Sequence, residues 1–175
     1  MNEFDVTISD VQIGFQSYSN RIPLKFGHEV TIYGETVRVF MTVTGQNGTS
    51  ACGCGETPLA AAWSWPSPLP QSVRVVRMKQ LCGDLAKAWK QEPTSGHPME
   101  IGHRFINGPL NDCLARANEK NPSQEGMPYL AALVCCSAFD LALYDAYGIL
   151  NEVKVFDTFN KKYMNHDLSY YYTGD

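Results

Sequence analysis

The chain has 175 residues, of which 44% are hydrophobic and 18% charged, so it carries enough apolar side chains to form a folded core. Its formal net charge is −4 and no basic cluster is visible, which excludes the usual nucleic-acid-binding proteins. The acidic N-terminus has no apolar signal segment, and no apolar run reaches the ~18 residues that span a bilayer. We therefore expect a cytoplasmic protein that contacts neither nucleic acid nor a membrane.

The first third of the chain is typical of β-strands. Residues 4–13 alternate apolar with polar side chains, and residues 36–44 place four apolar side chains on one face. Residues 16–20 interrupt this pattern with small and polar side chains. Asn47-Gly48 favours positive φ at both central positions of a turn, so a third strand at residues 49–55 should pair back antiparallel. The small residues of that strand would let another backbone or a ligand approach closely.

A proline-rich segment follows. Residues 57–70 contain four prolines, which exclude a regular helix there. Trp63 and Trp65 lie within this segment, so we expect an ordered loop with two aromatic anchors.

The remainder has helical periodicity. Apolar side chains predict helices at residues 71–89, 99–119 and 127–149, the second of them kinked or split at Gly108-Pro109. A short helix at residues 153–163 and a strand-like, aromatic end at residues 167–175 complete the pattern. Strands followed by helices predict an α+β fold, with a three-stranded antiparallel sheet packed on a bundle of three to four helices.

Three motifs in this order carry a family resemblance. The sheet hairpin ends in Gly53-Cys54-Gly55-Glu56, the long helix carries the sequence SAFDLALYDAYG at residues 137–148, and a short helix follows at residues 153–159. This set resembles the N-terminal capping domain of the enolase superfamily, in particular its mandelate racemase and muconate lactonizing enzyme branch. Members have G-x-G-E after the hairpin and A-h-D-h-A-h-x-D-h-x-G in the helix, where h is hydrophobic.

The resemblance implies that residues 1–165 form the capping domain and residues 166–175 begin a truncated β/α barrel. In the family the cap closes over the barrel mouth, where active sites of β/α barrels lie. Three carboxylates on barrel strands hold Mg²⁺, and lysine or histidine bases remove a proton α to a carboxylate, giving an enolate that the metal stabilises. Those strands follow the first barrel strand, expected here at residues 168–173. The chain should therefore be inactive as a fragment, with Mg²⁺ bound only in the full-length enzyme.

The resemblance also implies the partners. These are a small-molecule carboxylate substrate and the barrel domain of the same polypeptide, and self-association stays open because family members commonly form homo-oligomers. The parent enzyme would be an isomerase or a lyase, acting as a racemase, epimerase, cycloisomerase or dehydratase, since the fold does not determine which reaction is catalysed.

Two loops of the family's cap reach the substrate, and here they would span residues 17–28 and 57–68. The resulting candidates for substrate binding, together with one residue at the end of the presumed barrel strand, are Arg21, Lys25, Phe26, His28, Thr57, Trp63, Trp65 and Thr173. Arg21 and Lys25 could pair with a carboxylate, and the tryptophans could form a lid that excludes water. The alternatives are solvated charges for Arg21 and Lys25, packing beneath the loop for Phe26, burial against the cap's own helices for the tryptophans, and a frayed terminus for Thr173.

Other functions remain open. The chain could be a stand-alone, non-catalytic α+β binding or interaction module. A thiol or zinc protein is a weaker option, because Cys-x-Cys and Cys-Cys lack the usual chelating spacing and six reduced, buried thiols fit the composition better. Glu56 is expected to be a structural hydrogen-bonding group, and Asp140 and Asp145 to hydrogen-bond between the cap and the barrel.

Overall fold

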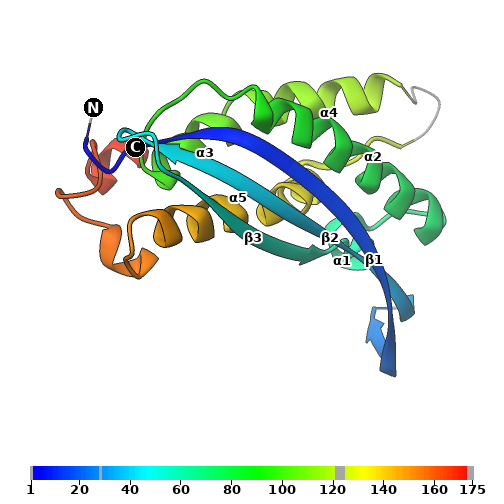
Figure 1. Cartoon of the computed structure of the whole chain (residues 1–175). Helices are drawn as coiled ribbons and strands as arrows, with labels where there is room; N and C mark the ends of the chain where they lie inside the picture. Colours follow the sequence, from blue (N-terminus) through cyan, green and yellow to red (C-terminus); the bar gives the residue numbers. More distant parts are fainter. Residues whose placement is uncertain (1, 28, 121–124, 173–175) are drawn as a thin grey trace.

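The computed structural model describes residues 2–27, 29–120 and 125–172. Its antiparallel sheet has the order β1 (Val6–Phe26), β2 (Glu29–Gly45) and β3 (Ser50–Pro58). The helices are α1 (Ala61–Ser64), α2 (Gln71–Lys90), α3 (Pro98–Ile106), α4 (Pro109–Glu119) and α5 (Tyr129–Leu150), followed by the 3₁₀ turns η1 (Val155–Thr158) and η2 (Leu168–Tyr171). The helices cover one face of the curved sheet (Figure 1), so the expected α+β architecture is confirmed.

The core lies between the sheet and α5. Alternate residues of β2 are fully buried, namely Val37, Val39, Met41 and Val43, as the period-2 pattern predicts. On β3, Gly53 and Gly55 face α5 so closely that an added Cβ would lie 2.1 Å from the Ala146 nitrogen and 2.0 Å from the Ala138 oxygen. The expected close approach of another backbone to β3 is therefore made by α5.

The β2–β3 hairpin is confirmed, with a different turn. In the described part of the turn only Gly48 has positive φ, at 80°. Its amide donates to Gly45 O (3.0 Å), and the Gly45 amide donates to Thr49 O (2.9 Å). This is a three-residue loop with glycine in the left-handed position. The Asn47 side chain accepts from the Thr49 amide (3.0 Å), which stabilises the turn while Asn47 keeps negative φ.

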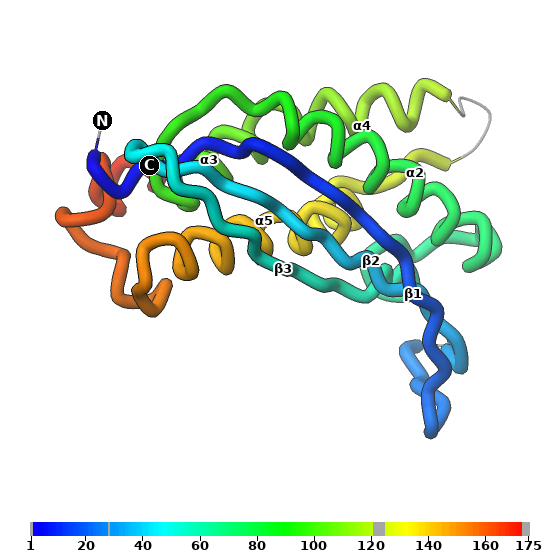
Figure 2. Tube along the Cα trace, in the orientation of Figure 1, coloured from blue at the N-terminus to red at the C-terminus, as the bar shows by residue number. Residues whose placement is uncertain are grey.

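The expected loop at residues 17–28 is wrong. β1 and β2 continue past the helices as a two-stranded ribbon, in which Ser17 pairs with Glu35 and Phe26 with Glu29 (Figure 2). The register shifts between Ser19 and Leu24, because Pro23 has no backbone donor and cannot join a regular ladder. The break in the sequence pattern thus marks an irregularity within this ribbon. We call residues 17–27 and 29–33 the ribbon hereafter.

The helix predictions hold with corrections. α2 begins at Gln71, and the second helical stretch is split into α3 and α4 at Gly108-Pro109. The apolar periodicity that predicts these helices counts Val76, Leu130 and Leu141 among the core-facing side chains, but all three are exposed. Arg74 and Arg77 of α2 are buried in their place.

α5 corrects the expectation about membrane-spanning length. By length and composition alone this helix is apolar enough to cross a bilayer. Half of its most apolar stretch is buried against the rest of the molecule, as in the central helix of a folded core.

The two short C-terminal elements differ from expectation. The helix at residues 153–163 is a single 3₁₀ turn, in which Thr158 Oγ1 donates to Val155 O (2.5 Å) and competes with helical bonding. The strand at residues 168–173 is also wrong, because Leu168–Tyr171 form a 3₁₀ turn capped by Asp167. No strand of the described sheet pairs with this segment, so local bonding decides its shape. The boundary at residue 165 stays a prediction.

Candidate functional site

Both expected capping segments lie at the same end of the sheet. β3 ends at Pro58, which pairs with Thr36, and the Leu59 amide donates to Glu35 O (2.8 Å). The segment at residues 57–70 therefore leaves the sheet at the root of the ribbon, where Figure 1 shows α1. The structure brings these two parts of the chain together, although about 30 residues of sheet separate them in sequence.

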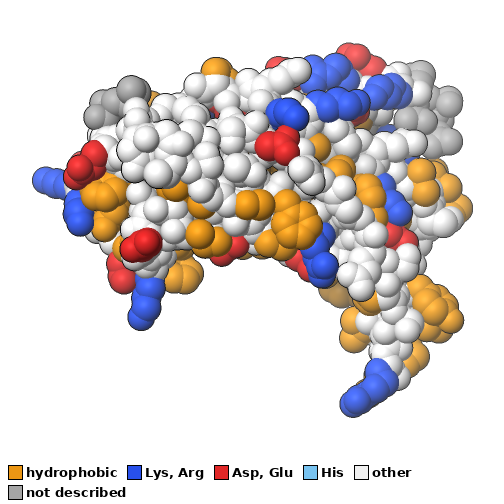
Figure 3. Space-filling view, viewed as in Figure 1, with side chains coloured by type: hydrophobic (Ala, Val, Ile, Leu, Met, Phe, Trp, Pro, Cys, Tyr) orange, Lys and Arg blue, Asp and Glu red, His pale blue; other side chains and the backbone are white. Residues whose placement is uncertain are grey.

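The ribbon presents most of its predicted site residues to solvent. Arg21 and Lys25 are exposed, and neither makes an ion pair within the described residues. Phe26 is 59% exposed, which excludes the alternative that it packs beneath a loop. Figure 3 shows apolar side chains gathered on the ribbon together with basic ones at its tip. His28 and Thr173 lie outside the described residues.

The two tryptophans have different roles. Trp63, on α1, is 43% exposed, whereas Trp65 is fully buried. Only Trp63 can face a ligand, and Trp65 is an anchor of the segment. Thr57 lies in β3, not in a loop, and its Oγ1 is 2.8 Å from Ser137 Oγ on α5. Thr57 is half-buried, and this contact fastens the start of the segment to α5.

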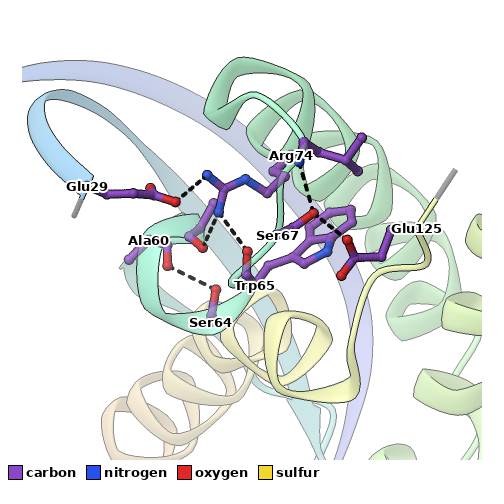
Figure 4. Close-up of polar contacts among 9 residues, drawn as sticks. Glu29, Ala60, Ser64, Trp65, Ser67, Arg74 and Glu125 are labelled. Atoms are coloured by element: carbon purple, nitrogen blue, oxygen red, sulfur yellow. Dashed lines mark hydrogen bonds and ion pairs between the residues drawn. The ribbon is translucent and has the colours of Figure 1, made fainter. Parts of the chain in front are cut away.

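Arg74 connects the two expected capping segments (Figure 4). Its Nη1 donates to the carbonyls of Ala61 (3.0 Å) and Trp65 (2.6 Å), and its Nη2 donates to Glu29 Oε1 (2.7 Å) at the start of β2. The Arg74 side chain is only 3% exposed. One buried guanidinium thus holds α1, the Trp65 backbone and the ribbon.

Arg77, one turn further along α2, holds the same segment from another side. Its guanidinium lies 4.8 Å from the centre of the Trp65 ring and donates to Glu125 O (2.8 Å). Ser67 Oγ donates to Glu125 Oε2 (2.7 Å), which ties the proline-rich segment to the start of the α5 region. Burial lowers the pKa of Arg77 without removing its charge.

A hollow of about 630 Å³ lies between the root of the ribbon and α2, walled by residues that include Tyr18, Tyr33, Val75 and Val76. Hydrogen bonds from Ser17 and Lys79 lower the pKa of Glu35 at its edge. None of the predicted site residues that the structure describes lines this hollow.

The remaining acidic and thiol candidates have structural surroundings. Glu56 accepts from Arg38 Nε (2.9 Å), in line with its expected hydrogen-bonding role. Asp145 accepts from the Cys54 amide (2.8 Å), a bond between α5 and β3 and not one that leaves the domain. Burial raises the pKa of Asp140 to about 6 in a groove between α3 and α5. Cys52 and Cys54 are exposed, contrary to the expectation of buried thiols, and all six cysteines are unpaired.

Sequence reasoning missed Arg74 and Glu29. A signal was present, because Arg74 lies in phase with the buried positions Met78, Leu81 and Leu85 of α2. A charged residue at such a position implies a buried partner. Glu29 carried no comparable signal, since its role depends on the ribbon reaching α2.

The fold of this chain is similar to part of a solved structure. An enolase from Bradyrhizobium, determined with magnesium and mandelic acid, aligns with 87% of this chain and 34% of its own at 15% identity and a TM-score of 0.50. A mandelate racemase/muconate lactonizing protein from Herpetosiphon aurantiacus aligns with 83% of this chain and 32% of its own at 12% identity, with a TM-score of 0.36. No protein-family model and no curated protein matches the sequence.

The chain spans about a third of the length of these solved structures. The likeness to the Bradyrhizobium enolase shows the fold alone: this chain has the fold of one part of that enzyme.

Proposed function

We propose that this chain is the capping domain that sets substrate specificity in a Mg²⁺-dependent enolase-superfamily enzyme, which removes a proton α to the carboxylate of a small molecule. The observation that carries the proposal is that the ribbon and residues 57–70, called the Trp63 segment hereafter, meet at one end of a sheet with this fold. The unpaired cysteines support the expected cytoplasmic location, because thiols persist in reducing compartments.

The exposed residues at that end suit a carboxylate substrate with an apolar body. Arg21 and Lys25 supply positive charge, of which Arg21 can bind a carboxylate in bidentate fashion. Phe26 and Trp63 supply exposed aromatic surface on the two segments. Closure of such a surface over a substrate would exclude water from the reacting atoms. Mandelic acid, bound in the Bradyrhizobium enolase, has this combination of an aromatic ring and a carboxylate.

We expect the metal to bind in the barrel and not in this chain. The described residues contain no group of three or more His, Cys, Asp or Glu side chains that could hold a cation. Mg²⁺, present in the Bradyrhizobium enolase, would stabilise the developing enolate from the barrel. The role of this chain's residues is to bind, orient and enclose the substrate.

The coding sequence beyond codon 175 provides the first test. We expect a β/α barrel with three Asp or Glu residues on successive strands and a lysine or histidine base. The complete polypeptide should then catalyse Mg²⁺-dependent exchange of the α-proton of mandelate or a related carboxylate in D₂O, followed by NMR. An unrelated continuation, or a stop codon with a stable folded product, would favour the stand-alone binding module instead.

Variants of the cap refine the test in the active protein. Arg21→Gln should raise KM about tenfold with little change in kcat, because one charge-assisted contact to the substrate is lost. Lys87→Gln is the matched control, since Lys87 is an exposed cation on α2 away from the ribbon. Equal KM values for the two variants would contradict a substrate-binding role for Arg21.

A further inference from the structure

We propose that Arg74 is a positioning residue that couples the ribbon to the Trp63 segment, so that the two capping segments move and order as one unit. The catalytic role of this coupling rests on the proposed function. The coupling itself can be tested without substrate and without a second domain.

The coupling rests on the geometry of one buried cation. Nη1 of Arg74 donates to two carbonyls of the Trp63 segment, and Nη2 donates to Glu29 of the ribbon. A guanidinium is planar and rigid, so it cannot keep one set of acceptors in place while turning away from the other. Displacement of Glu29 therefore changes the position of the donors to Ala61 O and Trp65 O.

Charge makes the coupling obligatory. Within the described residues Glu29 is the only carboxylate in ion-pair contact with Arg74, and Arg74 Nε is buried without a partner. Loss of Glu29 would leave a guanidinium that is 97% buried with no counter-charge, which is strongly unfavourable. The side chain would then move towards water and abandon both carbonyls.

The described residues of the ribbon make no second polar link of this kind. Among the described residues, the side-chain hydrogen bonds of residues 17–33 run to the sheet itself, except for the bond from Arg74 to Glu29. Lys79 binds Glu35 at the root of the ribbon, before it extends past the helices. The Glu29–Arg74 pair is thus the contact through which a displacement of the ribbon reaches the Trp63 segment.

Amide hydrogen exchange in the purified 175-residue chain tests the coupling. The key variant is Glu29→Gln, which preserves shape, removes the charge and changes a side chain that is 28% exposed. The key amides are those of Ser64 and Trp65, which donate to Ala60 O (3.3 Å) and Ala61 O (3.0 Å). We expect these two amides to exchange at least tenfold faster in E29Q, while the α5 amides keep their wild-type rates.

Two further variants make the result decisive. Glu56→Gln removes the exposed ion pair with Arg38 on the sheet, and it should leave the Ser64 and Trp65 amides unchanged. Arg74→Lys keeps the charge, but a single ammonium cannot span Glu29 and both carbonyls. R74K should therefore match E29Q, and the double variant should exchange no faster than either one.

The proposal is overturned if E29Q accelerates exchange in the ribbon and leaves Ser64 and Trp65 within twofold of wild type. Additive effects of E29Q and R74K would overturn it as well. If R74K also loses protection in α5, it has unfolded globally, and E29Q alone decides. A negative result leaves the proposed capping function standing, whereas failure of the barrel or of Mg²⁺-dependent exchange leaves the coupling standing.

Discussion

The same two strands make two different structures along their length. In the half that pairs at residues 36–45, β2 is buried on alternate positions and β3 lies against the backbone of α5. In the ribbon, apolar side chains such as Ile22, Leu24 and Val30 are more than half exposed. The first half contributes to the stability of the fold, and the second half displays an exposed apolar surface. A capping domain needs both, because a specificity-determining surface is useful only on a rigid support.

The largest effect should come from the glycine contacts of the buried half. Gly55→Ala would place a Cβ 2.0 Å from the Ala138 carbonyl oxygen, so α5 must move away from the sheet. We expect a loss of about 3 kcal/mol or more in unfolding free energy, measured by urea denaturation. The control is Gly83→Ala on α2, where an added Cβ meets nothing within 4 Å and should stabilise by about 0.5–1 kcal/mol. Equal stabilities for the two variants would refute the close packing of β3 on α5.

A matched pair on β2 compares the two halves directly. Val39 is fully buried and Val30 is 54% exposed, so the same change tests both environments. Val39→Ala should cost about 2 kcal/mol, and Val30→Ala less than about 0.5 kcal/mol. Chemical denaturation of both variants measures the difference. Similar costs would mean that the ribbon is covered in solution, for instance by self-association.

The pH dependence of stability should come from the helical side of the buried half, where two titratable groups have opposite effects. Burial lowers the pKa of His97 to about 4, so this group favours the folded state above pH 6.5 and loses that contribution as pH falls towards 4. Burial raises the pKa of Asp140 to about 6, so this group favours the folded state at low pH and loses that contribution as pH rises through 6. The two contributions nearly cancel between pH 4 and 6.

Single substitutions should reveal each contribution. Relative to wild type, Asp140→Asn should make stability rise with pH between 4 and 6, by at most about 1.4 kcal/mol per pH unit. His97→Asn, which retains an acceptor at the N-cap of α3, should produce the opposite slope. Thermal melts at several pH values measure both slopes. Parallel curves for the three proteins would show that these two groups are not perturbed by burial.

The smallest effect on stability should come from Trp63→Phe, whose main consequence is a change in fluorescence. Of the three tryptophans, Trp63 is 43% exposed, while Trp65 and Trp89 are fully buried. Trp63→Phe should remove most of the fluorescence that acrylamide quenches and change the unfolding free energy by less than about 0.5 kcal/mol. A stability loss as large as that of Trp65→Phe would mean that Trp63 is an anchor and not part of a lid.

Local sequence patterns predicted several elements of this fold. Alternating valines specified the buried face of β2, the Asn47-Gly48 turn specified the hairpin, and Gly108-Pro109 specified the break between α3 and α4. These features depend on a residue and its near neighbours, so they can be predicted from the sequence. The order of the predicted elements then indicated the fold. The substrate-facing assignments of Arg21, Lys25, Phe26 and Trp63 remain predictions that agree with their exposure.

Tertiary structure decided the rest. Residues 17–26 form a strand because they pair with residues 29–35 of β2, and no local rule distinguishes that ribbon from a loop interrupted by Pro23. The separate fates of Trp63 and Trp65, two residues apart, depend on which of them reaches α2. Arg74 and Glu29 are 45 residues apart and meet only because the ribbon crosses the start of α2. Sequence determined most of the elements of the buried half, while packing over long separations decided the ribbon and determined which side chains share a site, since contact energy depends on distance in space.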